Sequence, residues 1–125
     1  MRIWLKSDVL AEPGPDGREV LTEDGRDRID SAMSTYLEYL PSNPVVIEGY
    51  AHGGTAAERF RLSRNRAALV REYVIAKYQL APQSTGYIGL GDQAPGSPDD
   101  DRWDGVSLTL FLDKAELRFA NRAAP

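Results

Sequence analysis

One arginine, Arg66, occupies a position where the sequence predicts a buried helix face. From about Ala57 onward, apolar side chains recur at helical spacing. They are Leu62, Leu69, Val70 and Tyr73. Arg66 lies within this stripe, and burying a guanidinium without a polar partner is costly. Because its planar fork of donors suits a carboxylate, the chemistry predicted here is carboxylate binding, to a ligand or to an internal acidic residue such as Glu48 or Asp92.

A glycine-rich turn, His52–Thr55, comes directly before that helix and after the β-branched run Val45–Ala51. Two adjacent glycines favour backbone angles that strands and helices avoid. Gly49 and Gly54 have the glycine spacing of a phosphate-binding loop, but that motif requires a lysine where this chain has Thr55. The sequence therefore argues against nucleotide binding.

The other reactive residue types form no catalytic or metal-binding pattern. The chain has no cysteine, which excludes disulfides, thiolate nucleophiles and cysteine-based metal sites. The acidic run Asp99–Asp101 lacks the alternating ligands and the shaping glycine of a calcium loop. Ser63 is not part of a nucleophile elbow. We therefore expect a non-enzymatic domain without a cofactor.

Six elements are expected to position these residues. In chain order they are a strand over Arg2–Leu10 followed by a turn-rich loop over Glu12–Gly17, a helix over Glu23–Leu40, a strand over Val45–Ala51, a helix from about Ala57 to Lys77 or Tyr78, a strand over Thr85–Leu90 and a strand over Val106–Leu112. Thr22 is the expected N-cap of the first helix. Strand–helix–strand units join parallel strands by crossover connections. The predicted fold class is therefore α+β, a βαβαββ two-layer sandwich in which both helices pack on one face of a mixed sheet.

Composition and charge limit the classes of protein to which the chain can belong. Its 125 residues, 42% of them apolar and 27% charged, are typical of one globular domain with a substantial core. The formal charge of −4 disfavours a basic, phosphate-binding surface, so no nucleic-acid partner is expected. No apolar run is long enough to cross a bilayer, and no signal peptide is visible. We expect either a cytoplasmic protein or an excised piece of a longer exported one.

Four motifs resemble the OmpA-like peptidoglycan-binding domain family in their residues and their order. Gly49–Gly53 is similar to the family's strand-end motif, and Leu62–Ala67 is similar to its Leu-Ser-x-x-Arg-Ala helix motif. Leu21–Gly25 resembles the opening of the family's first helix, and Gly89–Pro95 resembles its Gly-x-Gly-(Glu/Asp)-x-x-Pro segment. We therefore expect an OmpA-like domain over residues 1–112. Residues 113–125 are then a C-terminal extension, expected to be a short helix or disordered.

The resemblance implies a non-catalytic, periplasmic or outer-membrane-associated domain of the bacterial cell envelope. Domains of this family bind the diaminopimelate of peptidoglycan stem peptides without forming a covalent bond. Their helix arginine holds a carboxylate of that residue, and Arg66 matches this position. Their strand-end aspartate pairs with the amine, and His52 stands in its place. Tyr50, Gly53 and Arg59 are the further residues expected at the ligand site.

Four departures from the family pattern fall around this one site. His52 supplies no negative charge for an ammonium group. Ala51 replaces a threonine, Arg59 replaces an asparagine, and Asp104–Gly105 replaces an arginine pair that commonly enters the last strand. Two hypotheses follow. Either the domain binds peptidoglycan peptides through an altered site, or it is a structural or protein-interaction module of a larger envelope protein.

Overall fold

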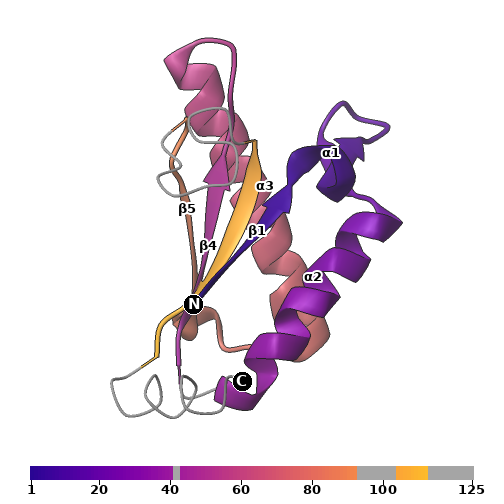
Figure 1. Ribbon diagram of the computed structural model, residues 1–125. Coiled ribbons are helices and arrows are strands. Elements are labelled where there is room, and N and C mark those ends of the chain that lie inside the picture. Colours follow the sequence, from indigo (N-terminus) through magenta and orange to yellow (C-terminus); the bar gives the residue numbers. More distant parts are fainter. Residues whose placement is uncertain (41–42, 93–103, 113–125) are drawn as a thin grey trace.

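The computed structural model describes residues 1–40, 43–92 and 104–112 (Figure 1). Its helices and strands are, in chain order, β1 (Arg2–Lys6), α1 (Ser7–Leu10), β2 (Ala11–Pro13), β3 (Glu19–Leu21), α2 (Glu23–Tyr36), β4 (Val45–Tyr50), α3 (Ala56–Tyr78), β5 (Thr85–Gly89) and β6 (Gly105–Leu110). Two short 3-10 turns, Leu37–Tyr39 and Pro82–Ser84, follow α2 and α3. No helix in these ranges is long and apolar enough to span a bilayer. The acidic run Asp99–Asp101 and the extension 113–125 lie outside the described residues.

The central element is a mixed four-stranded sheet in the order β1-β6-β4-β5. β4 and β5 run parallel and are connected through α3, whereas β6 runs antiparallel to both of its neighbours, β1 and β4. Figure 1 shows α2 and α3 together on one side of this sheet. The predicted α+β sandwich with both helices on one face is therefore confirmed. β2 and β3 form a separate antiparallel hairpin.

Both long helices begin at capping residues that the sequence provides. Thr55, the N-cap of α3, accepts a hydrogen bond from the backbone N–H of Glu58 at 3.1 Å, and its hydroxyl donates to the Glu58 carboxylate at 3.1 Å. Thr22, the predicted N-cap of α2, accepts from the backbone N–H of Gly25 at 2.8 Å. α3 ends where Gln79 adopts a left-handed conformation with a φ of 54°. These local signals explain why the bounds of α3 agree closely with the predicted ones.

Two glycines allow α3 to lie close against the sheet. A Cβ atom at Gly49 in β4 would lie 1.8 Å from the carbonyl oxygen of Ser63, and one at Gly89 in β5 would lie 2.8 Å from Ser63 Oγ. The hydroxyl of Ser63 also accepts a hydrogen bond from the backbone N–H of Gly91 at 3.1 Å. The helix and the sheet therefore meet at backbone distance around Ser63.

The buried face of α3 consequently differs from the predicted stripe. Its buried residues are Ser63, Arg66, Ala67, Val70 and Val74. Leu62 and Leu69, which were expected to be core residues, are only half-buried. That part of the prediction was wrong because small side chains fit where the helix approaches glycine backbone, and leucine does not. The expected burial of Arg66 and Val70 is confirmed.

The N-terminal strand is shorter than predicted. β1 ends at Lys6, and Ser7–Leu10 form one turn of helix in place of the strand expected to continue to Leu10. This turn buries the side chain of Leu10, which is 1% exposed. It also brings the Leu10 backbone against Gly25 of α2, where a Cβ atom would lie 2.1 Å from the Leu10 carbonyl oxygen. Packing against α2 therefore overrides the strand pattern.

The predicted loop over Glu12–Gly17 overlaps a hairpin that the sequence did not reveal. β2 and β3 contain three residues each, too few to show a strand period. The hairpin places Glu19 beside α3. The first long helix also ends earlier than predicted, because the α-helical pattern stops at Tyr36 and continues as a 3-10 turn.

One carboxylate, Asp30 of α2, connects the two long helices. It accepts hydrogen bonds from the hydroxyls of Tyr73 at 3.0 Å and Tyr78 at 2.6 Å, and from the ammonium of Lys77. Burial raises the pKa of Asp30, but the three donors outweigh burial and hold it below its ordinary value. Burial, together with the Asp30 carboxylate, raises the pKa of Tyr78 to about 12. The Tyr78 hydroxyl therefore remains a donor across the physiological pH range.

Candidate functional site

Arg66 forms a side-on ion pair with Glu19, which comes from the β2–β3 hairpin. Arg66 Nε donates to Glu19 Oε1 at 2.9 Å, and Arg66 Nη2 donates to Glu19 Oε2 at 3.3 Å. The arginine is 7% exposed. Two parallel N–H···O bonds between a guanidinium and a carboxylate are the strongest form of this contact. The hairpin that the sequence did not reveal thus supplies the first partner of Arg66.

A second carboxylate reaches the same guanidinium from the other side. Arg66 Nη1 donates to Asp104 Oδ1 and to the backbone carbonyl of Tyr50 at 3.2 Å. Asp104 directly precedes β6, and Tyr50 is the last residue of β4. These two bonds and the two bonds to Glu19 together engage four of the five N–H donors of the guanidinium. Arg66 therefore links α3, β3, β4 and the entrance to β6.

The electrostatics of this cluster oppose a further anion. Burial lowers the pKa of Arg66, but the hydrogen bonds that Arg66 donates to Glu19 and the charges of Asp104 and Glu19 outweigh burial and raise the pKa above its ordinary value. One positive and two negative charges give Arg66, Glu19 and Asp104 a formal sum of −1. The two carboxylates are 26% and 36% exposed, so each also contacts solvent. A ligand carboxylate at this position would meet net negative charge.

The expectation of an internal carboxylate partner was correct in kind, but both named partners were wrong. Glu48 accepts hydrogen bonds from Ser107 at 2.9 Å and Thr109 at 2.7 Å, and it pairs with Arg2 at 3.2 Å. These residues lie in β1, β4 and β6, where side chains alternate between the two faces of the sheet. Glu48 is thus already satisfied by neighbouring strands.

Asp92, the other partner considered, pairs with Arg59 at 3.5 Å. Arg59 Nη1 also donates to the backbone carbonyl of Gly54 at 2.6 Å. Arg59 was predicted as a ligand-site residue. In the structure, Arg59 connects the turn before α3 to Asp92, which follows β5.

His52 and Gly53 lie exposed in the turn between β4 and α3. Gly53 has a φ of +93° and the next residue, Gly54, has a φ of +74°, so the turn requires the conformational freedom of glycine at both positions. Among the described residues, no hydrogen bond or ion pair connects His52 to Arg66. The structure therefore does not bring these two predicted site residues into contact.

Tyr50 contributes its backbone, not its ring, to the arginine cluster. Its side chain is 1% exposed and packs against Trp4, with ring centroids 5.6 Å apart. Burial raises the pKa of the Tyr50 hydroxyl, which keeps it protonated. The ring is a packing element, and only the carbonyl oxygen reaches Arg66.

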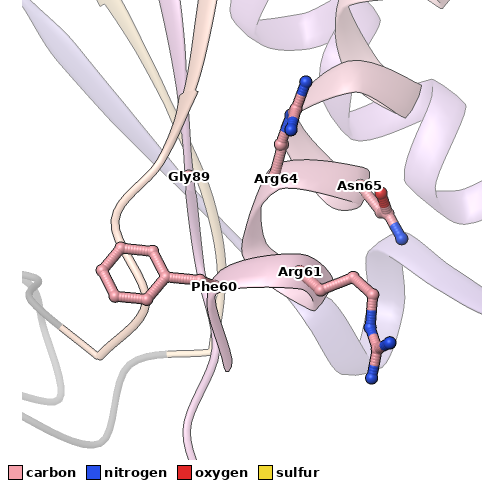
Figure 2. Close-up of a pocket in the computed structure, with 5 residues that line it drawn as sticks. All are labelled: Phe60, Arg61, Arg64, Asn65 and Gly89. Carbon is pink, nitrogen blue, oxygen red and sulfur yellow. The ribbon is translucent and has the colours of Figure 1, made fainter. Parts of the chain in front are cut away.

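Two of the hollows lined by described residues border α3, and Arg66 lines neither of these two. One, of about 610 Å³, lies between the β2–β3 hairpin and α3, and its wall includes Arg18, Glu19 and Leu69. The other, of about 350 Å³, is drawn in Figure 2 and lies between α3 and the end of β5. The described part of the chain contains no group of three or more histidine, aspartate or glutamate residues able to hold a metal ion.

Comparisons with known proteins identify the fold. No protein-family model and no curated protein matches the sequence. Among solved structures, the periplasmic domain of Helicobacter pylori MotB has a TM-score of 0.64 at 19% identity, covering 99% of this chain and 87% of that one. The peptidoglycan-associated lipoprotein from Burkholderia pseudomallei has a TM-score of 0.59 at 14% identity, covering 88% of this chain and 89% of that one.

A third solved structure, the OmpA-like domain of FopA1 from Francisella tularensis, has a TM-score of 0.56 at 24% identity. It covers 71% of this chain and 62% of that one. Likeness at these identities is likeness of fold. The chain therefore has the OmpA-like fold that its motifs predicted.

Proposed function

We propose that this chain is a non-catalytic module of the bacterial cell envelope whose inherited ligand pocket is occupied by its own carboxylates. Its structural neighbours are named as a periplasmic domain, an OmpA-like domain and a peptidoglycan-associated lipoprotein, which supports a location facing the cell wall. In this proposal Arg66 is a structural residue, and the module serves its parent protein through other surfaces. The observation that carries it is the pairing of Arg66 with Glu19 and Asp104.

A diaminopimelate carboxylate would have to replace one of these two internal partners. Displacing Glu19 breaks a bidentate pair, and displacing Asp104 breaks a charge-assisted hydrogen bond. Losing such a contact costs about 1.5–3 kcal/mol, or roughly ten- to a hundredfold in affinity. The ligand amine finds no compensating aspartate in the turn, because His52 occupies that position. We therefore expect diaminopimelate binding far weaker than that of an open arginine site.

The test is an NMR titration of the labelled domain with a diaminopimelate-containing muropeptide. The wild-type chain should show no saturable shifts at millimolar ligand. The double variant Glu19→Gln, Asp104→Asn should bind, because it removes both internal carboxylates while keeping their size. Adding Arg66→Ala to that variant should abolish the gain. Saturable shifts at His52, Gly53 and Arg66 in the wild-type chain, lost in Arg66→Ala, would contradict the proposal.

A second candidate function keeps peptidoglycan binding, with the ligand carboxylate displacing Asp104 alone. The exposure of the Asp104 side chain, 36%, favours it, because this partner can turn into solvent more easily than Glu19 can. The same titration separates the two candidates. Under the second, the wild-type chain binds measurably, and Asp104→Asn alone strengthens the binding about tenfold.

A further inference from the structure

Among the described residues, β5 forms one outer edge of the sheet, and its own sequence carries none of the usual protection of an edge strand. Within the described residues it pairs only with β4. Three of its five residues, Gly86, Tyr87 and Ile88, are exposed, and none of the five is charged. Edge strands present backbone N–H and C=O groups that can pair with another chain, and proteins commonly block them with charges or proline. β5 carries neither.

Unpaired cations flank this edge. Arg61 and Arg64 of α3 are exposed, and no described carboxylate lies within ion-pair distance of either one. Arg71 lies over the ring of Tyr87, 5.4 Å from its centroid, and its hydrogen bonds go to backbone carbonyls. The chain has 19 acidic and 15 basic residues, so its net charge is negative. A row of arginines without acidic partners is therefore a local exception to the charge of the whole chain. Three arginines without described acidic partners therefore lie on the flank of α3 beside β5.

A hollow connects the cations to the strand. Its lining includes Phe60, Arg61, Arg64 and Gly89. Phe60 is 52% exposed. Figure 2 shows its ring on the strand side of α3, with Arg61 and Arg64 extending from the helix in different directions. Guanidiniums that spread along an edge suit successive acidic groups along a chain better than they suit one small anion.

We propose that the β5 edge binds an extended acidic segment of a partner protein, which adds to the sheet as a further strand. Strand addition of this kind draws its affinity from backbone hydrogen bonds and its specificity from alternate side chains. The two faces of β5 indicate the pattern of the segment. Tyr87 and Gly89 face α3, since Arg71 stacks on the former and a Cβ atom at the latter would meet Arg64.

Ile88, which lies between Tyr87 and Gly89 in the strand, faces the opposite side of the sheet and is 47% exposed. The partner segment should therefore alternate, with acidic side chains toward α3 and apolar side chains toward Ile88. Side chains on one side of a strand recur about every 7 Å. Arg64 and Arg71 lie about 10 Å apart along the helix, a spacing that flexible arginine side chains can adapt to this repeat.

A second copy of this chain fits the edge poorly. Pairing β5 with β5 would bring two sets of unpaired arginines together, and like charges placed opposite each other are destabilising. The complementary partner must carry the opposite charge. Arg66 takes no part in this contact, so the inference does not depend on whether the arginine pocket is closed.

The probe is a synthetic peptide of alternating valine and aspartate, long enough to span β5. We expect saturable NMR shifts at the backbone amides of Gly86–Gly89. Arg64→Glu should weaken binding about tenfold, because it replaces an attraction by a repulsion. Arg28→Glu is the matched control, since it makes the same charge change at an exposed position of α2 and should leave the affinity within twofold of wild type. The same peptide N-methylated at alternate residues should not bind, since it lacks the donors for strand pairing.

Several outcomes would overturn the inference. They are an absence of shifts at β5 with millimolar peptide, equal binding by the N-methylated peptide, and an equal loss of affinity in Arg28→Glu. Binding to vesicles of anionic phospholipid without binding to the peptide would assign the arginine stripe to a membrane surface instead. None of these outcomes bears on the muropeptide titration, so the two proposals fail separately.

Discussion

The guanidinium of Arg66 is held by two carboxylates of the same chain. The guanidinium keeps the donor geometry that would hold a carboxylate, and Glu19 and Asp104 occupy that geometry from opposite sides. A buried ion pair adds little net stability when it is complete, because desolvation offsets the attraction. Removing one partner is far more damaging, since it leaves a charge uncompensated in a site that is largely closed to water.

Arg66→Ala should therefore lower the free energy of unfolding by about 2–4 kcal/mol, reduced from the fully buried case because both carboxylates touch solvent. Arg64→Ala is the control, because Arg64 is exposed and has no described carboxylate partner. This variant should change the free energy of unfolding by at most about 0.5 kcal/mol. Urea unfolding measures both. Adding Glu19→Gln and Asp104→Asn to Arg66→Ala should recover part of the loss. An Arg66→Ala variant as stable as Arg64→Ala would mean that the cluster does not hold the fold together.

The need of Arg66 for a carboxylate was predictable from its position alone, but the identity of its partners was not. The cost of burying an unpaired guanidinium requires an acidic neighbour. Glu19 lies 47 residues earlier, in a hairpin whose three-residue strands give no periodic signal. Asp104 offered one clue, since it stands where the resembling family has an arginine. A reversal of charge beside a buried cation is the pattern that could have indicated the pair.

Among the elements, the contact between α3 and the sheet depends on two glycines. Long elements with a clear period or a cap, such as α2, α3 and β6, agree with their predicted bounds to within a few residues. The packed face of α3 could not be predicted in the same way. Helical spacing favours Leu62 and Leu69, but the close approach at Gly49 admits only small side chains such as Ser63 and Ala67.

Gly49→Ala should destabilise the domain by about 3 kcal/mol or prevent folding, because its Cβ would lie 1.8 Å from the Ser63 carbonyl oxygen. Gly86→Ala in β5 is the matched control. The nearest atom to a Cβ there is a Val46 methyl at 3.6 Å, which is an ordinary contact, so its stability should stay within about 1 kcal/mol of wild type. Thermal unfolding followed by circular dichroism compares the two. Similar melting temperatures would show that α3 can move away from the sheet at little cost.

The Asp30 contact between α2 and α3 should be visible as a pH dependence. Folding lowers the pKa of Asp30, so the charged carboxylate contributes to the free energy of unfolding. This contribution is complete at pH values above the ordinary pKa of aspartate, and it is lost as the pH falls through the pKa of the folded state. The stability difference between wild type and Asp30→Asn should therefore be constant well above the ordinary pKa of aspartate and shrink as the pH falls below it. Asp27→Asn, which removes a carboxylate at an exposed position of α2, serves as the control. Urea midpoints measured at falling pH give the answer, and a difference that does not shrink on acidification would refute the assignment.

For the molecule as a whole, charge is distributed unevenly. The net charge is −4, yet the flank of α3 beside β5 carries arginines without described acidic partners. Composition argues against a generally basic surface, but a local patch is a property of the folded arrangement. It arises because helical spacing gathers Arg61, Arg64 and Arg71 on one flank, while Arg66 lies about 200° around the helix from Arg64.

Association at this flank should therefore depend on salt. The affinity for the alternating valine–aspartate peptide should fall about tenfold between low and high ionic strength, because exposed charges are screened within a Debye length of about 10 Å at 0.1 M salt. Titration calorimetry at two salt concentrations measures the change. The Arg64→Glu variant should show a much smaller dependence. An affinity that does not change with salt would mean that the arginines play no part in attracting the segment.

The pairing of Arg66 with Asp104 affects the concentration at which another carboxylate can compete for the guanidinium. Asp104 belongs to the same chain, so it competes with any soluble carboxylate as a tethered group. Tethering through a short segment corresponds to an effective concentration on the order of millimolar or more. A soluble carboxylate at micromolar concentration therefore displaces Asp104 only if it binds the guanidinium roughly a thousandfold more tightly than Asp104 does. Any exchange of partners at Arg66 thus depends on the local concentration of the competing carboxylate as well as on its affinity.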